Sequence, residues 1–129
     1  MNFSLTSRTF IALGALLAFL SVGLGAFGAH AVKQSIPTDM LKIYQTAVEY
    51  QFFHALGIIL TGLIYQFQPN RLIKSAGWLM FAGIIIFSGS LYILSLSGIR
   101  WLGAITPLGG TAFLLAWLIL VYALIRPVK

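Results

Sequence analysis

"TFIALGALLAFLSVGLGAFGAHA", residues 9–31, is an apolar run that contains no Asp, Glu, Lys or Arg. A helix needs about 20 such residues to cross the roughly 30 Å hydrocarbon core of a bilayer. Lipid offers no hydrogen-bond partner to an exposed backbone, and the run lacks the alternation that is typical of a strand. The run therefore predicts a transmembrane helix and an α-helical membrane protein.

The same stretch shares some features with a cleavable signal peptide. Arg8 precedes the apolar residues, and the triplet Ala29-His30-Ala31 is similar to a cleavage site. The apolar region of a signal peptide, however, is only about 7–15 residues long. We therefore expect this segment to be retained as the first membrane span.

The composition of the whole chain supports a membrane location. Of 129 residues, 60% are hydrophobic and 8% are charged, with a mean hydropathy of +0.98, whereas a soluble domain has about 25% charged residues. The formal charge of +6 does not indicate nucleic-acid binding, because the basic residues lie singly at the ends of apolar runs. There they can reach anionic headgroups. We therefore expect the lipid bilayer as partner and no nucleic acid, and the absence of cysteine excludes thiolate metal sites and disulfides.

Three further apolar segments, residues 47–67, 72–96 and 101–125, are long enough to span a membrane. The links between successive segments are short, which predicts one membrane domain over residues 1–129. Its fold class is all-α, an integral-membrane four-helix bundle with up-down-up-down topology. Pro37 followed by Thr38 and Asp39 predicts that the second helix begins near Thr38, with Thr38 as its cap.

The basic residues also predict the orientation of the chain. If the N-terminus is inside, five basic residues are cytoplasmic: Arg8, Arg71, Lys74, Arg126 and Lys129. Three would be outside: Lys33, Lys42 and Arg100. The positive-inside rule then favours a multi-pass protein of the cytoplasmic (inner) membrane with both termini in the cytoplasm.

Small residues recur along the first span at spacings of four and three, and they form the stripe Gly14, Ala18, Ser21, Gly25 and Gly28. Such a stripe allows a neighbouring helix to approach closely. In the fourth span, Gly109 and Gly110 offer a similar small surface, and we expect Pro107 to kink the helix.

The second span carries an unusual number of polar side chains in "YQTAVEYQFFH", residues 44–54. An ionisable residue within a membrane is a candidate for function. Glu49 and His54 lie roughly 140° apart on an ideal helix, so they face different neighbours. We expect a polar cluster in the outer half of the bundle, in which Arg100 or a histidine neutralises Glu49. The candidate ligand-binding or network residues are His30, Glu49, Tyr50, His54 and Arg100.

Two interpretations of this cluster remain open. The first is a hydrogen-bonded network that fixes the helix register, and the second is a site for a ligand, a proton or an ion. A haem held by two histidines and a zinc ion held by His30, Glu49 and His54 are less favoured, because neither the depth nor the spacing fits a known pattern. No nucleophile–base pair, phosphate-binding loop or paired carboxylate occurs, so we expect no enzymatic activity, no cofactor and no metal.

Four segments resemble the YgdD-type family of small bacterial inner-membrane proteins, a domain of unknown function with eukaryotic relatives. They are LGALLAFLSVGLGAFGAH, YQTAVEYQFFHALGI, FSGSLY and RWLGAITPLGGTAFLLAW. The resemblance covers nearly the whole chain, from about Leu13 to Trp117. The resemblance implies a four-helix plasma-membrane protein without settled catalytic residues, and some family members are linked to membrane stability. Its signature positions here are Gly25, Gly28, His30, Glu49, Tyr50, His54, Arg100, Pro107, Gly109 and Gly110.

We therefore expect a structural or accessory membrane protein that associates with copies of itself or with a membrane-protein partner. The alternative is a small transporter or channel that uses the outer polar cluster. Four helices leave little room for an aqueous path, so transport would require an oligomer. A haem or redox subunit is the third interpretation.

Overall fold

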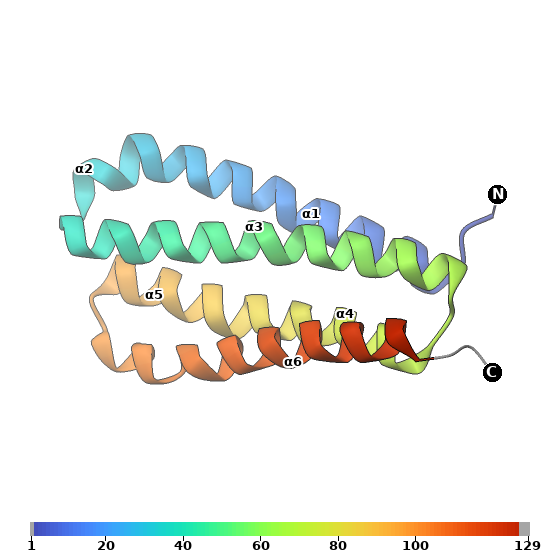
Figure 1. Ribbon diagram of the computed structural model, residues 1–129. Coiled ribbons are helices and arrows are strands. Elements are labelled where there is room, and N and C mark those ends of the chain that lie inside the picture. Colours follow the sequence, from blue (N-terminus) through green and yellow to red (C-terminus); the bar gives the residue numbers. More distant parts are fainter. Residues whose placement is uncertain (1, 127–129) are drawn as a thin grey trace.

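The computed structural model describes residues 2–126, and these residues form helices with no strand. Four continuous helical segments are long and apolar enough to cross a membrane: Leu5–Ser35, Thr38–Phe67, Arg71–Ser97 and Arg100–Ile125. They run alternately up and down and are joined by short connections (Figure 1). The predicted all-α, four-helix architecture is confirmed.

The first span consists of α1 (Leu5–Phe27), a π-helical segment η1 (Gly28–Val32) and the short α2 (Lys33–Ser35). Ser4 caps α1, because its hydroxyl accepts a hydrogen bond from the Ser7 amide at 3.2 Å. The span ends at Ile36, whose extended backbone (φ −129°, ψ 156°) is the conformation favoured before a proline.

The second span is the single helix α3 (Thr38–Phe67). It begins at Thr38 as predicted, but Thr38 is the first helical residue and not the cap, because Pro37 occupies the cap position without a side-chain hydrogen bond. Asp39 lies in the first turn, where its charge is favourable to the helix dipole.

The third span consists of α4 (Arg71–Gly83), a second π-helical segment η2 (Ile84–Ser88) and α5 (Gly89–Ser97). Asn70 caps α4 by accepting a hydrogen bond from the Leu72 amide at 2.8 Å. The span ends at Gly98, whose φ of +74° lies in the left-handed region that glycine adopts without strain.

The fourth span consists of a 3₁₀ segment η3 (Arg100–Ala104) and α6 (Thr106–Ile125). The predicted kink at Pro107 is wrong, because Pro107 lies in the first turn of α6 and not within a longer helix. A proline is accommodated there since the first-turn amides have no helical acceptor and its fixed φ suits the start of a helix.

The spans pack in two antiparallel pairs, α1 with α3 and α4–α5 with α6 (Figure 1). Apolar side chains from all four spans meet in one core, which includes Phe10, Ile58, Met80 and Phe113. We call the end with connections 36–37 and 98–99 the loop end. We call the opposite end the terminal end. It contains the start of α1, the connection 68–70 and the end of α6.

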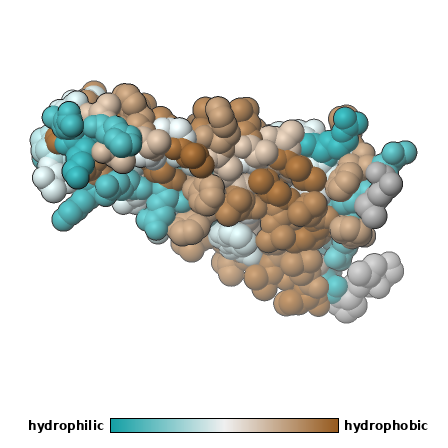
Figure 2. Space-filling model, turned by 90° about the horizontal axis from the view of Figure 1, so that it is seen from above, coloured by the Kyte–Doolittle hydropathy of each residue, from teal (hydrophilic) through white to brown (hydrophobic). Residues whose placement is uncertain are grey.

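Figure 2 shows a hydrophobic middle between hydrophilic residues at both ends, as a bilayer requires.

Candidate functional site

A buried glutamine connects three spans in the half of the bundle nearer the loop end. Gln51 on α3 is 4% exposed. Its Nε2 atom donates to the Leu17 carbonyl of α1 at 3.0 Å. The Tyr92 hydroxyl of α5 donates to its Oε1 atom at 2.7 Å. Both ends of the amide are therefore hydrogen-bonded inside the protein.

Two further bonds extend this arrangement toward the loop end. The Tyr44 hydroxyl donates to the Leu24 carbonyl at 2.6 Å, and the Ser88 hydroxyl donates to the Ala47 carbonyl at 2.8 Å. The Tyr44 ring packs edge-on against Tyr92, with 5.4 Å between ring centroids. We call Tyr44, Gln51, Ser88 and Tyr92 the buried polar network, and it joins the first, second and third spans.

The two π-helical segments lie beside this network. The Tyr44 ring packs so closely on Gly28, the first residue of η1, that a Cβ atom there would overlap it. Ser88, the last residue of η2, supplies the hydroxyl that binds α3. Such π-helical turns are frequent at functional sites.

Ser21 has the only buried side-chain oxygen or nitrogen atom without a hydrogen-bond partner among residues 2–126. A serine in a helix usually donates back to the carbonyl one turn earlier, which here is Leu17. That carbonyl already accepts the helical amide bond and the Gln51 amide, so both of its lone pairs are used.

His54 lies on another face of α3, against α6. Its Nδ1 atom donates to the Tyr50 carbonyl at 2.8 Å, and its Nε2 atom accepts from the Trp117 indole at 3.1 Å. The ring stacks on Phe113 with 3.5 Å between centroids. These partners assign the neutral Nδ1–H tautomer. With Tyr50 and Phe87, which also stack here, these side chains form the aromatic cluster.

The expected pairing of Glu49 with Arg100 or a histidine is wrong. Arg100 forms an ion pair with Asp39 at 3.5 Å, between side chains that are 76% and 62% exposed. Asp39 precedes Glu49 by ten residues, or about 15 Å along a helix, and Arg100 lies at the loop end beside the start of α3. Glu49 is exposed and has no ion pair within the described part of the chain.

The two histidines lie in different environments. His30 is exposed on η1 and makes no side-chain hydrogen bond to the residues that the structure describes, whereas His54 is buried. Across residues 2–126, no group of three His, Cys, Asp or Glu side chains could hold a metal ion. Of the five candidates, only Tyr50 and His54 are brought together, in the aromatic cluster.

The small-residue stripe of the first span lies against α3. Gly14, Ser21 and Gly28 are buried, and Ala18 and Gly25 are half-buried. The backbone of α3 comes close at Gly14, where a Cβ atom would lie 2.6 Å from the Ala55 carbonyl oxygen. In the fourth span, Gly109 packs against the Phe87 backbone, whereas Gly110 has only ordinary contacts.

A cleft of about 570 Å³ opens between α1 and the η2–α5 part of the third span. Leucines and isoleucines line most of it, including Leu17, Leu24 and Ile93. Three residues of the buried polar network also line it: Gln51, Ser88 and Tyr92. The cleft is therefore an apolar hollow, and the network side chains that line it are bonded within the protein.

The sequence-based candidates omitted the residues that form the buried polar network. Glu49 and Arg100 were candidates because they are charged, but an uncharged amide or hydroxyl in lipid also requires a hydrogen-bond partner. Gln51 and Tyr44 lie in the same polar segment as Glu49. The sequence feature that could have predicted the network is the presence of these two residues together with a first span rich in small residues.

Comparison with known proteins identifies relatives over nearly the whole chain. The UPF0382 membrane protein YwdK of Bacillus subtilis is 49% identical over 124 residues, which cover 92% of this chain and 98% of that protein. A UPF0382 membrane protein of Staphylococcus epidermidis is 46% identical over 119 residues, covering 92% and 97%. One from Staphylococcus haemolyticus is 47% identical over 114 residues, covering 88% and 93%.

The names of these relatives state a membrane location and no activity. No solved structure matches the chain. Residues 24–110, which include the buried polar network and the start of α6, match the family model described as "Protein of unknown function (DUF423)". The chain therefore belongs to the DUF423 family and is a multi-pass membrane protein.

Proposed function

We propose that the protein is a non-catalytic structural or accessory component of the cytoplasmic membrane. The observation that carries this proposal is that the buried polar network directs its hydrogen bonds to the protein's own helices. Gln51 uses both ends of its amide on α1 and α5, and the Tyr44 and Ser88 hydroxyls bind backbone carbonyls. These groups fix the positions of three spans.

The aromatic cluster supports the same role. A histidine that relays protons or binds a ligand needs a ring nitrogen that can exchange partners. Both ring nitrogens of His54 are bonded within the protein, and its ring is stacked on Phe113. Freeing one nitrogen would leave a buried polar group unpaired, which costs about 1–3 kcal/mol. The arrangement favours a rigid scaffold that presents fixed surfaces to lipid, to another copy or to a membrane-protein partner.

One observation favours a transporter as the second candidate. Gln51 and Tyr92 line the cleft between α1 and α5, which has a volume of about 570 Å³ and is open at the side of the bundle. A solute could exchange with the hydrogen bond between these two side chains if the helices moved apart. Such a function would make Tyr92 and Gln51 essential for flux and not only for stability.

Proteoliposomes and a deletion strain distinguish the two functions. For the accessory role, we expect purified protein to give no saturable solute or proton flux above empty liposomes. Loss of the gene should change membrane permeability to a dye, and Tyr92→Phe should restore it in proportion to the folded protein present. Saturable flux that is abolished by Tyr92→Phe or His54→Ala, while folding is preserved, would establish transport and overturn the proposal.

A further inference from the structure

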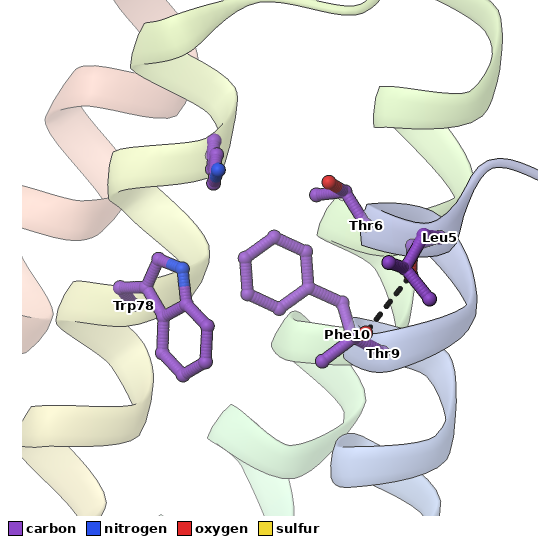
Figure 3. Close-up of a pocket in the computed structure, with 6 residues that line it drawn as sticks. Leu5, Thr6, Thr9, Phe10 and Trp78 are labelled. Carbon is purple, nitrogen blue, oxygen red and sulfur yellow. Dashed lines mark hydrogen bonds between the residues drawn. The ribbon is translucent and has the colours of Figure 1, made fainter.

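A pocket of about 200 Å³ lies between α1 and α4 near the terminal end (Figure 3). The first turns of α1 contribute Leu5, Thr6, Thr9 and Phe10, and α4 contributes Lys74 and Trp78. The pocket is separate from the buried polar network, the aromatic cluster and the cleft. It combines one cation, two hydroxyls and an aromatic wall.

The apolar part of the pocket is firmly held. Phe10 is fully buried and extends from α1 toward Trp78, with 5.3 Å between ring centroids in an edge-to-face arrangement (Figure 3). Its ring packs directly on Gly77 of α4. Trp78 is 44% exposed, so one part of its ring supports the pocket while another part faces the surroundings. Tryptophan in this position is typical of the membrane–water interface.

The polar part of the pocket has unused hydrogen-bonding capacity. Lys74 is exposed and has no ion pair with any residue in the range 2–126. The Thr6 hydroxyl is half-buried and makes no hydrogen bond with the described residues. Thr9 donates to the Leu5 carbonyl at 2.9 Å, which leaves its oxygen able to accept. An ammonium group and a hydroxyl are donors that suit a phosphate oxygen.

Charge is distributed unevenly between the two ends of the molecule. Arg8, Arg71, Lys74 and Arg126 lie at or near the terminal end. The chain has only two acidic residues, Asp39 and Glu49, and both belong to the half of α3 nearer the loop end. No carboxylate of the described chain therefore competes with an external anion for Lys74.

We propose that this pocket binds an anionic phospholipid of the surrounding bilayer. The phosphate is bound by the Lys74 ammonium and the Thr6 hydroxyl, and the upper acyl chain lies against Trp78 and Leu5. A basic pocket between membrane helices is suited to such headgroups. The occupant is a lipid, because the cation adjoins an apolar wall at the membrane interface and not an aqueous cavity. This inference depends on the membrane location and not on the accessory role.

Quenching of tryptophan fluorescence by lipids with brominated acyl chains tests the proposal. In phosphatidylcholine vesicles, we expect brominated phosphatidylglycerol to quench the protein more strongly than brominated phosphatidylcholine. Trp78→Phe should remove this difference, and Trp101→Phe, the matched control at the loop end, should retain it. Native mass spectrometry of protein offered both lipids should show preferential retention of phosphatidylglycerol.

Replacement of the lysine identifies the binding group. Lys74→Gln should lower the preference for phosphatidylglycerol about fivefold, the equivalent of the roughly 1 kcal/mol that one lysine contributes near an anionic surface. Lys74→Arg should retain the preference, as should Lys42→Gln, which removes an exposed lysine near the loop end. The contrary result is a preference that survives in Lys74→Gln and is lost only when Arg8, Arg71 and Arg126 are replaced. It would assign lipid binding to the basic residues of the terminal end as a group and contradict the proposed pocket.

Discussion

Gln51 donates one hydrogen bond and accepts another although its side chain is almost fully buried. The Tyr92 hydroxyl depends on it, because its proton has the Gln51 amide oxygen as acceptor. Hydrogen bonds between membrane helices contribute about 0.6 kcal/mol on average, but an abandoned buried partner costs about 1–3 kcal/mol. Removing the amide therefore costs the unpaired Tyr92 hydroxyl as well as the two lost bonds.

We predict that Gln51→Leu lowers the free energy of unfolding by about 1–3 kcal/mol. The substitution keeps the volume of the side chain approximately but leaves the Tyr92 hydroxyl without an acceptor. Equilibrium unfolding in mixed detergent micelles measures the change. The matched control is Gln45→Leu, a glutamine on the same helix that is exposed, and it should change stability by less than about 0.5 kcal/mol. Equal effects of the two substitutions would contradict a structural role for the network.

The bond between His54 and Trp117 is best tested by a double-mutant cycle. The single variants His54→Leu and Trp117→Phe and their combination should give a coupling energy of about 0.5–1.5 kcal/mol, because each single change removes the same hydrogen bond. Combining His54→Leu with Trp101→Phe serves as the control. Trp101 is 67% exposed, so those two changes should be additive. Additivity in both cycles would exclude a significant bond.

Single residues also show where sequence-based prediction of the site fails. The prediction that Glu49 and His54 face different neighbours is correct, since Glu49 is exposed and His54 is buried. Helical periodicity is sufficient for that distinction. The partner of Arg100 could not be found in the same way, because it depends on where the 3₁₀ segment η3 places the arginine relative to the first turn of α3.

At the scale of elements, α1 and α3 form the most extensive helix pair. Helices in lipid gain stability from close packing, and close packing requires small residues at the points of contact. Gly14 is such a point, because its neighbours include the backbone of Ala55 and Ile59, which cannot rotate away as a side chain can. The spacing of small residues along the first span was visible in the sequence, whereas the identity of the partner helix was not.

Gly14→Ala should destabilise the protein by about 1–3 kcal/mol, because the added methyl group would force α1 and α3 apart. The control is Gly23→Ala on the same helix. A Cβ atom at Gly23 would meet no atom within 4 Å, so this variant should be neutral or more stable by up to about 1 kcal/mol through helix propensity. Thermal unfolding of the two purified variants tests the prediction. Destabilisation of both variants alike would indicate that the helix backbone, and not the contact with α3, is responsible.

The irregular segments could not be predicted from local sequence. The π-helical segment η1 lies where the Tyr44 ring from α3 packs on Gly28 and the Tyr44 hydroxyl donates to the Leu24 carbonyl. The segment η2 lies where Ser88 binds a carbonyl of α3. Both therefore lie at contacts with another span, which the local sequence does not show. Pro107 shows the same limit, because whether a proline kinks a helix or begins one depends on where the helix starts.

At the scale of the whole molecule, hydropathy and length were sufficient for the architecture. Each of the expected ranges 9–31, 47–67, 72–96 and 101–125 lies within one of the observed helical segments. This follows from the bilayer, which permits few backbone arrangements across its core. The helices extend beyond the expected ranges mainly toward the loop end, where residues 33–46 are too polar to be counted as membrane-spanning.

The basic residues predict the orientation of the molecule in the membrane. Of the five basic residues predicted to be cytoplasmic, Arg8, Arg71, Lys74 and Arg126 belong to the described terminal end, and Lys129 lies outside the described residues. Five basic residues against three favour this end as the cytoplasmic one by the positive-inside rule, and this orientation remains a prediction. The same assignment would place the anionic-lipid pocket in the cytoplasmic leaflet.

Single cysteines test the orientation directly, because the natural chain has none. We predict that a membrane-impermeant maleimide labels Gln34→Cys in intact cells and labels Pro69→Cys only after the membrane is permeabilised. Both positions are exposed and lie at opposite ends of the bundle. Labelling of both variants after permeabilisation controls for their reactivity. Labelling of Pro69→Cys alone in intact cells would reverse the orientation. The pocket at Lys74 would then face the outer leaflet.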